Sequence, residues 1–193
     1  STYGKVQGSE LSAKTDMHKV YFHKLGTKQS EDKHIIGDEN FKRRYMNIGV
    51  SDDERFLILN AATATNGNEL YIKDLQNKTD FLPIQKGYEF NTDFVDSKGD
   101  FIYALTDKNA PNMRLIKFNI NQPDVWIDVI PQTENVLSVS TGGGYIFAKY
   151  MKDAVTSVKQ FDYDGKLIRT IGLPGIGTAS GFGGKEKEKD LYF

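Results

Sequence analysis

The sequence predicts an all-β fold in which short antiparallel strands recur in sets of four. Apolar runs begin at positions 56, 101, 145 and 191, so successive runs start 45, 44 and 46 residues apart. β-branched and aromatic residues dominate these runs, and no segment keeps apolar residues at helical spacing over three turns. The chain is therefore a repeat of strands rather than of helices.

Each repeat contains four segments with the character of strands. The first alternates polar and apolar residues, as in 46–50 and 136–140, and a turn rich in Asp, Ser or Gly separates it from the apolar run. A second run follows at 70–74, 115–118 and 158–162, and a short further strand follows at 81–84, 126–130 and 167–171. Four strands in about 45 residues form the blade of a β-propeller.

We expect three complete blades, at residues 43–87, 88–132 and 135–173, and two partial ones. Residues 18–37 supply the outer strands of a first blade, and residues 176–193 begin a last blade and stop inside its second strand. The final apolar strand would be left with an unpaired edge, which indicates a truncated chain. The alternative is that the two ends complete one shared blade and close a small four-bladed ring, a stand-alone module that binds proteins or glycans.

Composition and charge exclude several classes of function. The 193 residues carry a net charge of −1, with 38% hydrophobic and 26% charged residues, so no basic field points to nucleic acid or an anionic membrane. Cysteine is absent, which excludes disulfides, thiolate metal sites and a cysteine nucleophile. No apolar run approaches the roughly 20 residues of a membrane span. We expect a soluble protein, either cytoplasmic or periplasmic.

The sequence predicts no catalytic residues. A serine nucleophile of the elbow type needs Gly-x-Ser-x-Gly followed by a helix, and the surroundings of Ser180 match neither requirement. The histidines His18, His23 and His34 all lie near the start of the chain, and none combines with a serine and an aspartate in a plausible triad order.

Cofactor and metal sites are not predicted either. Glycines 175, 177 and 181 are wrongly spaced for a dinucleotide loop and precede no helix, and residues 141–144 suit a hairpin turn. Residues 162–165 open like a calcium loop but lack the later acidic ligands. The run at 185–190 alternates in charge and is typical of a solvated hairpin tip.

Residues 14–32 resemble the "LYYHxLGTxQSED" segment of the prolyl oligopeptidase propeller, most closely at 23–32. Segments 51–56, 109–115, 134–137 and 180–182 resemble the same family in the same order, so the similarity covers essentially the whole chain. The resemblance implies part of a seven-bladed propeller that caps an α/β-hydrolase domain. That family cleaves short peptides after proline with a Ser-Asp-His triad, and this chain would lack the hydrolase domain. A related peptidase of different specificity would share such a propeller.

Two groups of residues are candidates for contact with substrate. In relatives, the loop matching 106–111 often carries an arginine that faces the cavity between the domains; the matching residue is Lys108, preceded by Asp107. Lysine keeps the charge but not the bidentate fork, and the alternative is an exposed loop lysine. The inner strands of a propeller line its channel, so we expect small polar residues there to let extended peptides pass: Asn47, Gly49, Ser138, Ser140 and Ser180.

The function that we expect is therefore substrate gating and scaffolding, with no activity of the chain alone. The expected partners are the α/β-hydrolase domain of the same parent chain and short proline-containing peptides, without cofactor, nucleic acid or membrane. Unpaired strand edges also predict self-association of the isolated arc.

Overall fold

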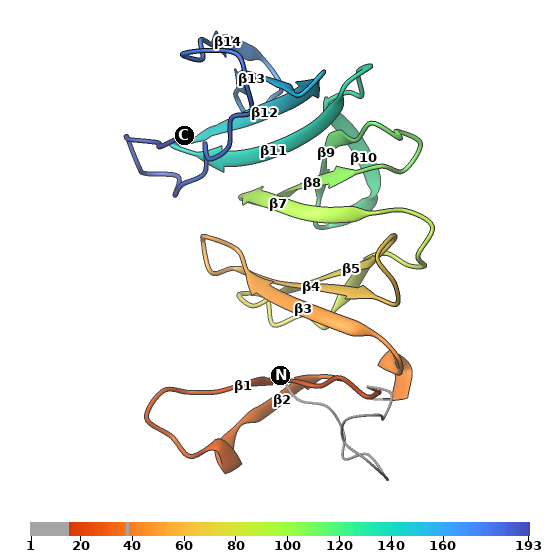
Figure 1. Cartoon of the computed structure of the whole chain (residues 1–193). Helices are drawn as coiled ribbons and strands as arrows, with labels where there is room; N and C mark the ends of the chain where they lie inside the picture. Colours follow the sequence, from red (N-terminus) through yellow and green to blue (C-terminus); the bar gives the residue numbers. More distant parts are fainter. Residues whose placement is uncertain (1–15, 38) are drawn as a thin grey trace.

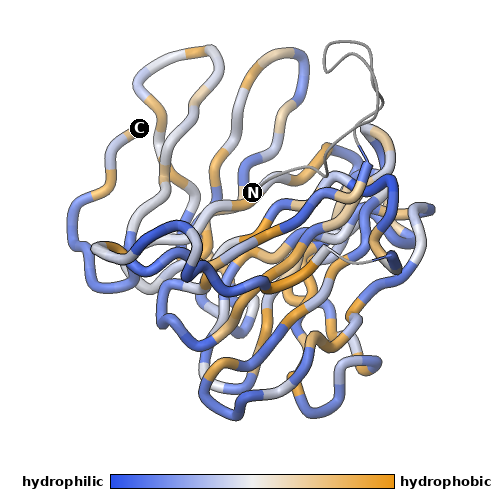
Figure 2. The backbone as a smooth tube through the Cα atoms, turned by 90° about the horizontal axis from the view of Figure 1, so that it is seen from below, coloured by the Kyte–Doolittle hydropathy of each residue, from blue (hydrophilic) through white to orange (hydrophobic). Residues whose placement is uncertain are grey.

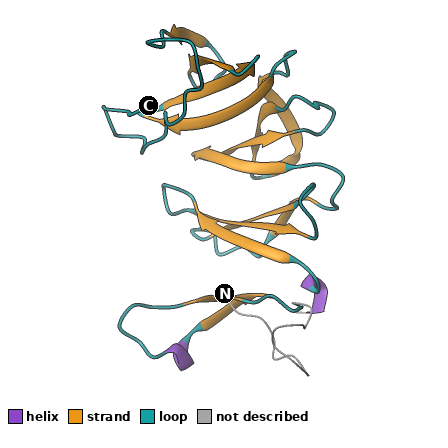
Figure 3. Cartoon of the chain, viewed as in Figure 1, coloured by secondary structure: helices purple, strands orange, loops and turns teal. Residues whose placement is uncertain are grey.

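The computed structural model describes residues 16–37 and 39–193, and these contain fourteen β-strands and two short 3₁₀ helices (Figure 3). The strands are β1 (Val20–Phe22), β2 (Lys33–Ile36), β3 (Tyr45–Val50), β4 (Phe56–Ala62), β5 (Glu69–Asp74), β6 (Leu82–Gln85), β7 (Thr92–Lys98), β8 (Phe101–Thr106), β9 (Arg114–Asn119), β10 (Gln122–Ile130), β11 (Val136–Gly142), β12 (Tyr145–Lys152), β13 (Val155–Phe161) and β14 (Leu167–Ile171). The helices are η1 (Gln29–Glu31) and η2 (Glu39–Phe41). Within the described residues, no helix has the length and hydrophobicity needed to cross a bilayer.

The strands form three four-stranded antiparallel sheets, each in simple chain order, and one two-stranded sheet. The sheets are β1-β2, β3-β4-β5-β6, β7-β8-β9-β10 and β11-β12-β13-β14, hereafter the first to fourth sheets. The prediction of an all-β fold made of four-stranded antiparallel blades is confirmed. The apolar runs at 56, 101 and 145 begin β4, β8 and β12, the second strand of each complete sheet.

The four sheets follow one another as an open arc. In Figure 1 the first and fourth sheets lie at opposite ends, and the first strands of the complete sheets, β3, β7 and β11, lie on the same side. We call these three the inner strands. The four-bladed ring considered from the sequence is not formed by the described residues, because the β1-β2 sheet and the segment after β14 do not share a sheet.

The last apolar run, residues 191–193, was expected to be a strand but has no regular strand structure. The segment turns back beside β11 instead, where Gly184 N donates to Thr141 O at 3.0 Å and Gly143 N donates to Lys185 O at 3.1 Å. Phe193 stacks on Phe182 with ring centroids 4.6 Å apart. The bonds of Gly184 and Lys185 hold the preceding residues beside β11, while residues 191–193 are held by the aromatic stacking and by Phe182 N, which donates to Tyr192 O at 3.2 Å.

Apolar layers fill the spaces between successive sheets. Phe56 and Ile58 of β4 pack against the third sheet, whereas Leu59 and Ala61 pack against the first. In β8, Ile102 and Ala104 face the second sheet. Alternate side chains of a strand point to opposite faces, so a strand covered on both faces is apolar at nearly every position. Figure 2 shows the hydrophobic stretches along the strands and hydrophilic turns between them.

The segment that most resembles the prolyl oligopeptidase family forms the β1–β2 hairpin. His23 Nδ1 and Asp32 Oδ1 lie 2.6 Å apart and close its loop. At its tip, the Leu25 side chain is 90% exposed. His18, just before β1, accepts a hydrogen bond from Met46 N at 3.0 Å and so ties this hairpin to β3. Lys14 and Thr15, where the resemblance begins, lie outside the described residues.

Candidate functional site at the inner strands

Register places one exposed polar residue at the same position of each inner strand. Asn47 pairs with Asn60, Asp93 with Leu105, and Ser138 with Lys149. Each partner lies four residues after the start of its own strand, β4, β8 or β12. Asn47, Asp93 and Ser138 are therefore equivalent, and all three are exposed. We call them the first row.

A second row lies two positions further along the ladder and consists of Gly49, Asp96 and Ser140. Their partners, Ile58, Tyr103 and Phe147, each lie two residues after the start of the second strand. In β7 a register shift between Phe94 and Asp96 brings Asp96 into this row. Asp96 is held in place, because Tyr163 OH donates to its carboxylate and Ser97 N donates to it at 2.8 Å.

The channel residues predicted from the sequence fall into two groups. Asn47, Gly49 and Ser138 are exposed on inner strands, and Ser140 is half-buried where its hydroxyl lies 3.4 Å from Gly181 O. Ser180 is exposed but belongs to the irregular segment after β14. Their role as channel lining remains a prediction.

Sequence reasoning missed the two acids of the middle inner strand, Asp93 and Asp96. The sequence repeat contained a signal for Asp93, because Asp93 occupies the same position in its strand as Asn47 and Ser138 do in theirs. Asp96 was hidden, because strict alternation puts residues three apart on opposite faces. Only the bulge places both acids on one face.

Several pKa values near these rows are raised. Partial desolvation by the surrounding protein, together with the nearby Asp107 carboxylate, raises the pKa of Asp93. Burial raises the pKa of Tyr103 to about 12, and its hydroxyl donates to Tyr163 O at 3.0 Å. Burial, followed by the hydrogen bond to Asp96, also raises the pKa of Tyr163. Both phenols therefore stay protonated donors at neutral pH.

The structure places Asp107 and Lys108 in different environments. Both carboxylate oxygens of Asp107 accept from Asn91, from the backbone N at 2.7 Å and from Nδ2 at 2.6 Å. Lys108 Nζ lies 5.0 Å from the ring centroid of Trp126, on the outermost strand of the same sheet. Asp107 thus fixes the β6–β7 connection, and Lys108 makes a cation–π contact.

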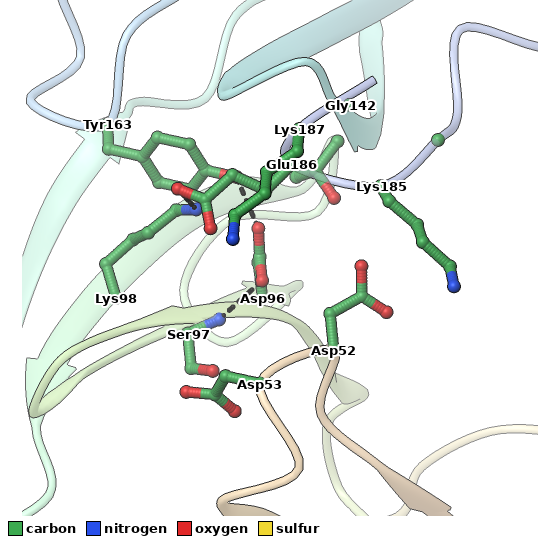
Figure 4. A pocket seen from close by; sticks show the side chains of 12 residues that line it. Asp52, Asp53, Asp96, Ser97, Lys98, Gly142, Tyr163, Lys185, Glu186 and Lys187 are labelled. Carbon is green, nitrogen blue, oxygen red and sulfur yellow. Dashed lines mark hydrogen bonds and ion pairs between the residues drawn. The ribbon is translucent and has the colours of Figure 1, made fainter.

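A pocket of about 350 Å³ lies where the ends of the inner strands meet (Figure 4). It is bounded by the β3–β4 turn, the end of β7, the end of β11 and the segment 184–187. Its lining includes Ser97, four carboxylates and three lysines: Asp52, Asp53, Asp96, Glu186, Lys98, Lys185 and Lys187. Among the described residues there is no group of three or more histidine or acidic side chains suited to a metal ion.

Comparison with known proteins gives matches over the whole chain. The family described as "Prolyl oligopeptidase, N-terminal beta-propeller domain" matches residues 1–193. The prolyl endopeptidases of Elizabethkingia meningoseptica and Elizabethkingia miricola are 59% and 58% identical to it over 196 residues. These alignments cover 100% of this chain and 28% of each relative. The chain thus spans less than a third of the length of the curated relatives that it matches.

The fold comparison agrees with the sequence comparison. A solved prolyl endopeptidase structure, from a study of inter-domain dynamics in two such enzymes, superposes with a TM-score of 0.82. It is 29% identical to this chain, and the match covers 90% of this chain and 26% of that one. The region shared with that structure is a minor part of its chain.

Proposed function

Because this chain belongs to the prolyl oligopeptidase family, we propose that it is the substrate-gating part of a longer serine peptidase that cleaves short peptides after proline. The observation that carries this proposal is the family match to the N-terminal propeller over residues 1–193. Its 59% identity to a named prolyl endopeptidase supports the same activity for the longer protein.

The partner that we propose is an α/β-hydrolase domain in the same parent chain. The relatives are more than three times as long as the matched region, which leaves room for such a domain. Short proline-containing peptides would be the substrates, and the chain alone would be inactive. Exposed apolar residues on the outer strand β14, Leu167 and Ile168, support the further expectation that the isolated chain self-associates.

The inner strands would carry out the gating. The first row offers an amide, a carboxylate and a hydroxyl to the solvent, and none of these is a large apolar group that would retain an extended peptide. The apolar layers between sheets hold these strands in place. Substrates would be selected by size because the strands are fixed, and small polar groups would let them pass without tight binding.

A chimera tests this function directly. The 193 residues replace the aligned region of the Elizabethkingia meningoseptica prolyl endopeptidase, to which they are 59% identical. We expect the chimera to hydrolyse a short chromogenic peptide at proline and to leave a folded, proline-containing protein intact. The isolated chain, assayed in parallel, should show no turnover.

Two results would contradict the proposal. One is a folded chimera that cleaves large and small substrates alike, because the inserted residues would then not gate. The other is turnover by the isolated chain that a serine-directed inhibitor abolishes, because the catalytic residues would then lie within these 193 positions.

A further inference from the structure

The pocket at the ends of the inner strands contains a buried hydroxyl without a partner. Ser97 is only 6% exposed, and its Oγ has no hydrogen-bond partner in the structure. Figure 4 shows the Ser97 side chain directed toward Asp53, on the acidic side of the pocket. A buried polar atom without a partner costs free energy, which a ligand with a hydrogen-bond donor would recover.

The carboxylates around Ser97 are held in place by bonds from their own elements. Asp53 Oδ1 accepts from Ser51 Oγ at 2.5 Å and from Arg55 N at 3.1 Å. Asp96 is held by Ser97 N and by the Tyr163 hydroxyl. Asp52, the next pocket residue in the β3–β4 turn, is exposed and directs its carboxylate toward the pocket (Figure 4). Asp53 of the second sheet and Ser97 of the third thus lie on the same side of β7, whereas Asp96 points to the opposite side, toward Tyr163.

The lysines of the pocket only partly neutralise these acids. Lys98 Nζ lies 2.7 Å from Glu186 Oε1 and 4.5 Å from the Tyr163 ring centroid, so its charge is already engaged. Lys185 and Lys187 lie on the exposed segment at the pocket's edge; in Figure 4 Lys187 reaches over the pocket and Lys185 extends on the side of Asp52. Four carboxylates against three lysines leave the lining with a net charge of −1, which favours a cation, and Lys185 and Lys187 would compete with it.

The chemistry of the acceptors identifies the kind of cation. No described group of three or more acidic or histidine side chains suits a metal ion. A primary ammonium has three N–H donors and one positive charge, which match the carboxylate oxygens of the β3–β4 turn and the unpartnered Ser97 hydroxyl. Such a group occurs in peptides as the terminal α-amine or as a lysine side chain.

We propose that this pocket binds the primary ammonium group of a peptide at one end of the inner strands. The proposal rests on the proposed gating function and adds a chemical preference to it: peptides with a free amine would be held at this site before or while they pass the inner strands. Neither the family match nor the first-row residues require this preference.

Calorimetric titration of the 193-residue chain with three matched peptides tests the proposal. One peptide has a free N-terminus and no lysine, one has an acetylated N-terminus and one lysine, and one is acetylated with norleucine in place of lysine. We expect the two peptides with an amine to bind at least about tenfold more tightly than the third, as hydrogen bonds to charged groups predict. Whichever of these two peptides binds more tightly shows whether the pocket prefers a terminal α-amine or a lysine side chain.

Variants locate the site. Asp52→Asn should weaken binding of the amine peptides about tenfold, and Ser97→Ala several-fold, because each removes an acceptor of the ammonium. Lys187→Met should strengthen binding, because it removes one of the two competing cations. Asp124→Asn changes an exposed acid on β10 outside this pocket and should leave the affinity unchanged. Because Asp52 is exposed, its substitution is expected to leave the fold intact, which circular dichroism checks.

Equal affinity for all three peptides would overturn the proposal, as would unchanged binding in Asp52→Asn together with Ser97→Ala. These failures are distinct from failure of the gating function, because titration involves no hydrolysis. A chimera that gates normally but shows no amine preference would leave the proposed function standing and remove only this inference.

Discussion

Arg55 and Asp74 are joined by two hydrogen bonds to a single oxygen: Nε and Nη2 of Arg55 both donate to Oδ2 of Asp74, at 3.0 and 2.8 Å. The same guanidinium reaches the next sheet, where Nη2 lies 2.8 Å from Asp100 Oδ1 and Nη1 donates to Gly99 O at 3.0 Å. The Arg55 side chain is 13% exposed and that of Asp74 is 4% exposed. One side chain therefore ties the second sheet to the third.

Loss of this tie should destabilise the chain. Arg55→Ala leaves the buried Asp74 carboxylate without its cation, and we expect it to lower the free energy of unfolding by about 3 kcal/mol. Arg55→Lys should recover part of this, because lysine keeps the charge but not the planar fork. Urea denaturation followed by circular dichroism measures both. Asp100→Asn, at a carboxylate that is 50% exposed, should cost less than about 1 kcal/mol; an equal loss for Asp100→Asn and Arg55→Ala would contradict this account.

The Asp74 carboxylate also gives stability a defined pH dependence. Burial alone would raise the pKa of Asp74, but hydrogen bonds from Asn77 and Arg55 outweigh it, so the pKa in the folded chain is lowered. Stabilisation from this group is therefore complete above the unfolded-state pKa of about 3.9 and is lost as pH falls through the lower folded-state value.

Comparison of Asp74→Asn with the unmodified chain isolates this contribution. The difference in unfolding free energy between them should be constant from pH 7 to about pH 5 and should shrink below about pH 4, as the native carboxylate is protonated. Denaturation at a series of pH values gives the curve. A difference that grows as pH falls would mean that the pKa of Asp74 is raised rather than lowered.

Two glycines with similar backbone angles separate steric from conformational effects. Gly67 has φ +76°, and an ideal Cβ there would lie 1.9 Å from Tyr88 O. Gly87 has φ +85°, and an ideal Cβ there would have no heavy atom of a non-adjacent residue within 4 Å. Gly87→Ala should cost about 1–2 kcal/mol, the penalty for a side chain in the left-handed region. Gly67→Ala should cost about 3 kcal/mol or more, because the backbone of Tyr88 must also move. Thermal unfolding of the two variants under identical conditions measures the difference, and similar losses would argue against the close approach.

The contact between Lys108 and Trp126 offers a test of the proposed substrate contact. Trp126 is the only tryptophan of the chain, so Lys108→Ala should change its fluorescence by removing the cation 5.0 Å from the ring centroid. In the chimera, a role in substrate binding predicts that KM for the proline peptide rises several-fold. Lys166→Ala, at an exposed lysine of a different turn, is the control for both measurements. An unchanged KM with altered fluorescence would assign Lys108 to packing alone.

The sequence was most informative where a strand is covered on both faces. Phe56, Phe101 and Tyr145 begin strands in the structure, because continuous apolar runs leave few alternatives once both faces must be buried. Leu191 continues the same spacing but not the structure, because a strand also needs a hydrogen-bonded neighbour and no described strand pairs with residues 191–193. Spacing predicts where a strand can form, and pairing determines whether it does.

The candidate site was less accessible to sequence reasoning, for two physical reasons. Asp96 reaches its place through a one-residue irregularity of β7, which side-chain alternation cannot reveal. Tyr163, which holds Asp96, is 67 residues away along the chain. The contact between Lys108 and Trp126 likewise depends on the twist of the third sheet, because Trp126 is on β10 and not in the loop that contains Lys108. Contacts between distant segments, unlike strand content, leave no local pattern.

The junction between the second and third sheets also contains a buried chain of polar contacts beside its apolar layer. Thr92 Oγ1 donates to Gln85 Oε1 at 2.5 Å and lies 2.8 Å from Thr106 Oγ1, while Gln85 Nε2 donates to Asn68 O at 2.9 Å. All four residues are at most 7% exposed. Apolar surfaces can shift relative to one another at little cost in free energy. These polar groups, in contrast, have only one alignment in which each makes its hydrogen bonds.

A shift of one sheet against its neighbour by a single strand spacing, about 4.8 Å, would leave all of these buried polar groups without hydrogen-bond partners. The polar contacts thus fix the position of the third sheet relative to the second. The angle between these two sheets contributes to the curvature of the arc. The width of the proposed passage along the inner strands would therefore depend on which hydrogen bonds these groups can form, rather than on the amount of surface buried.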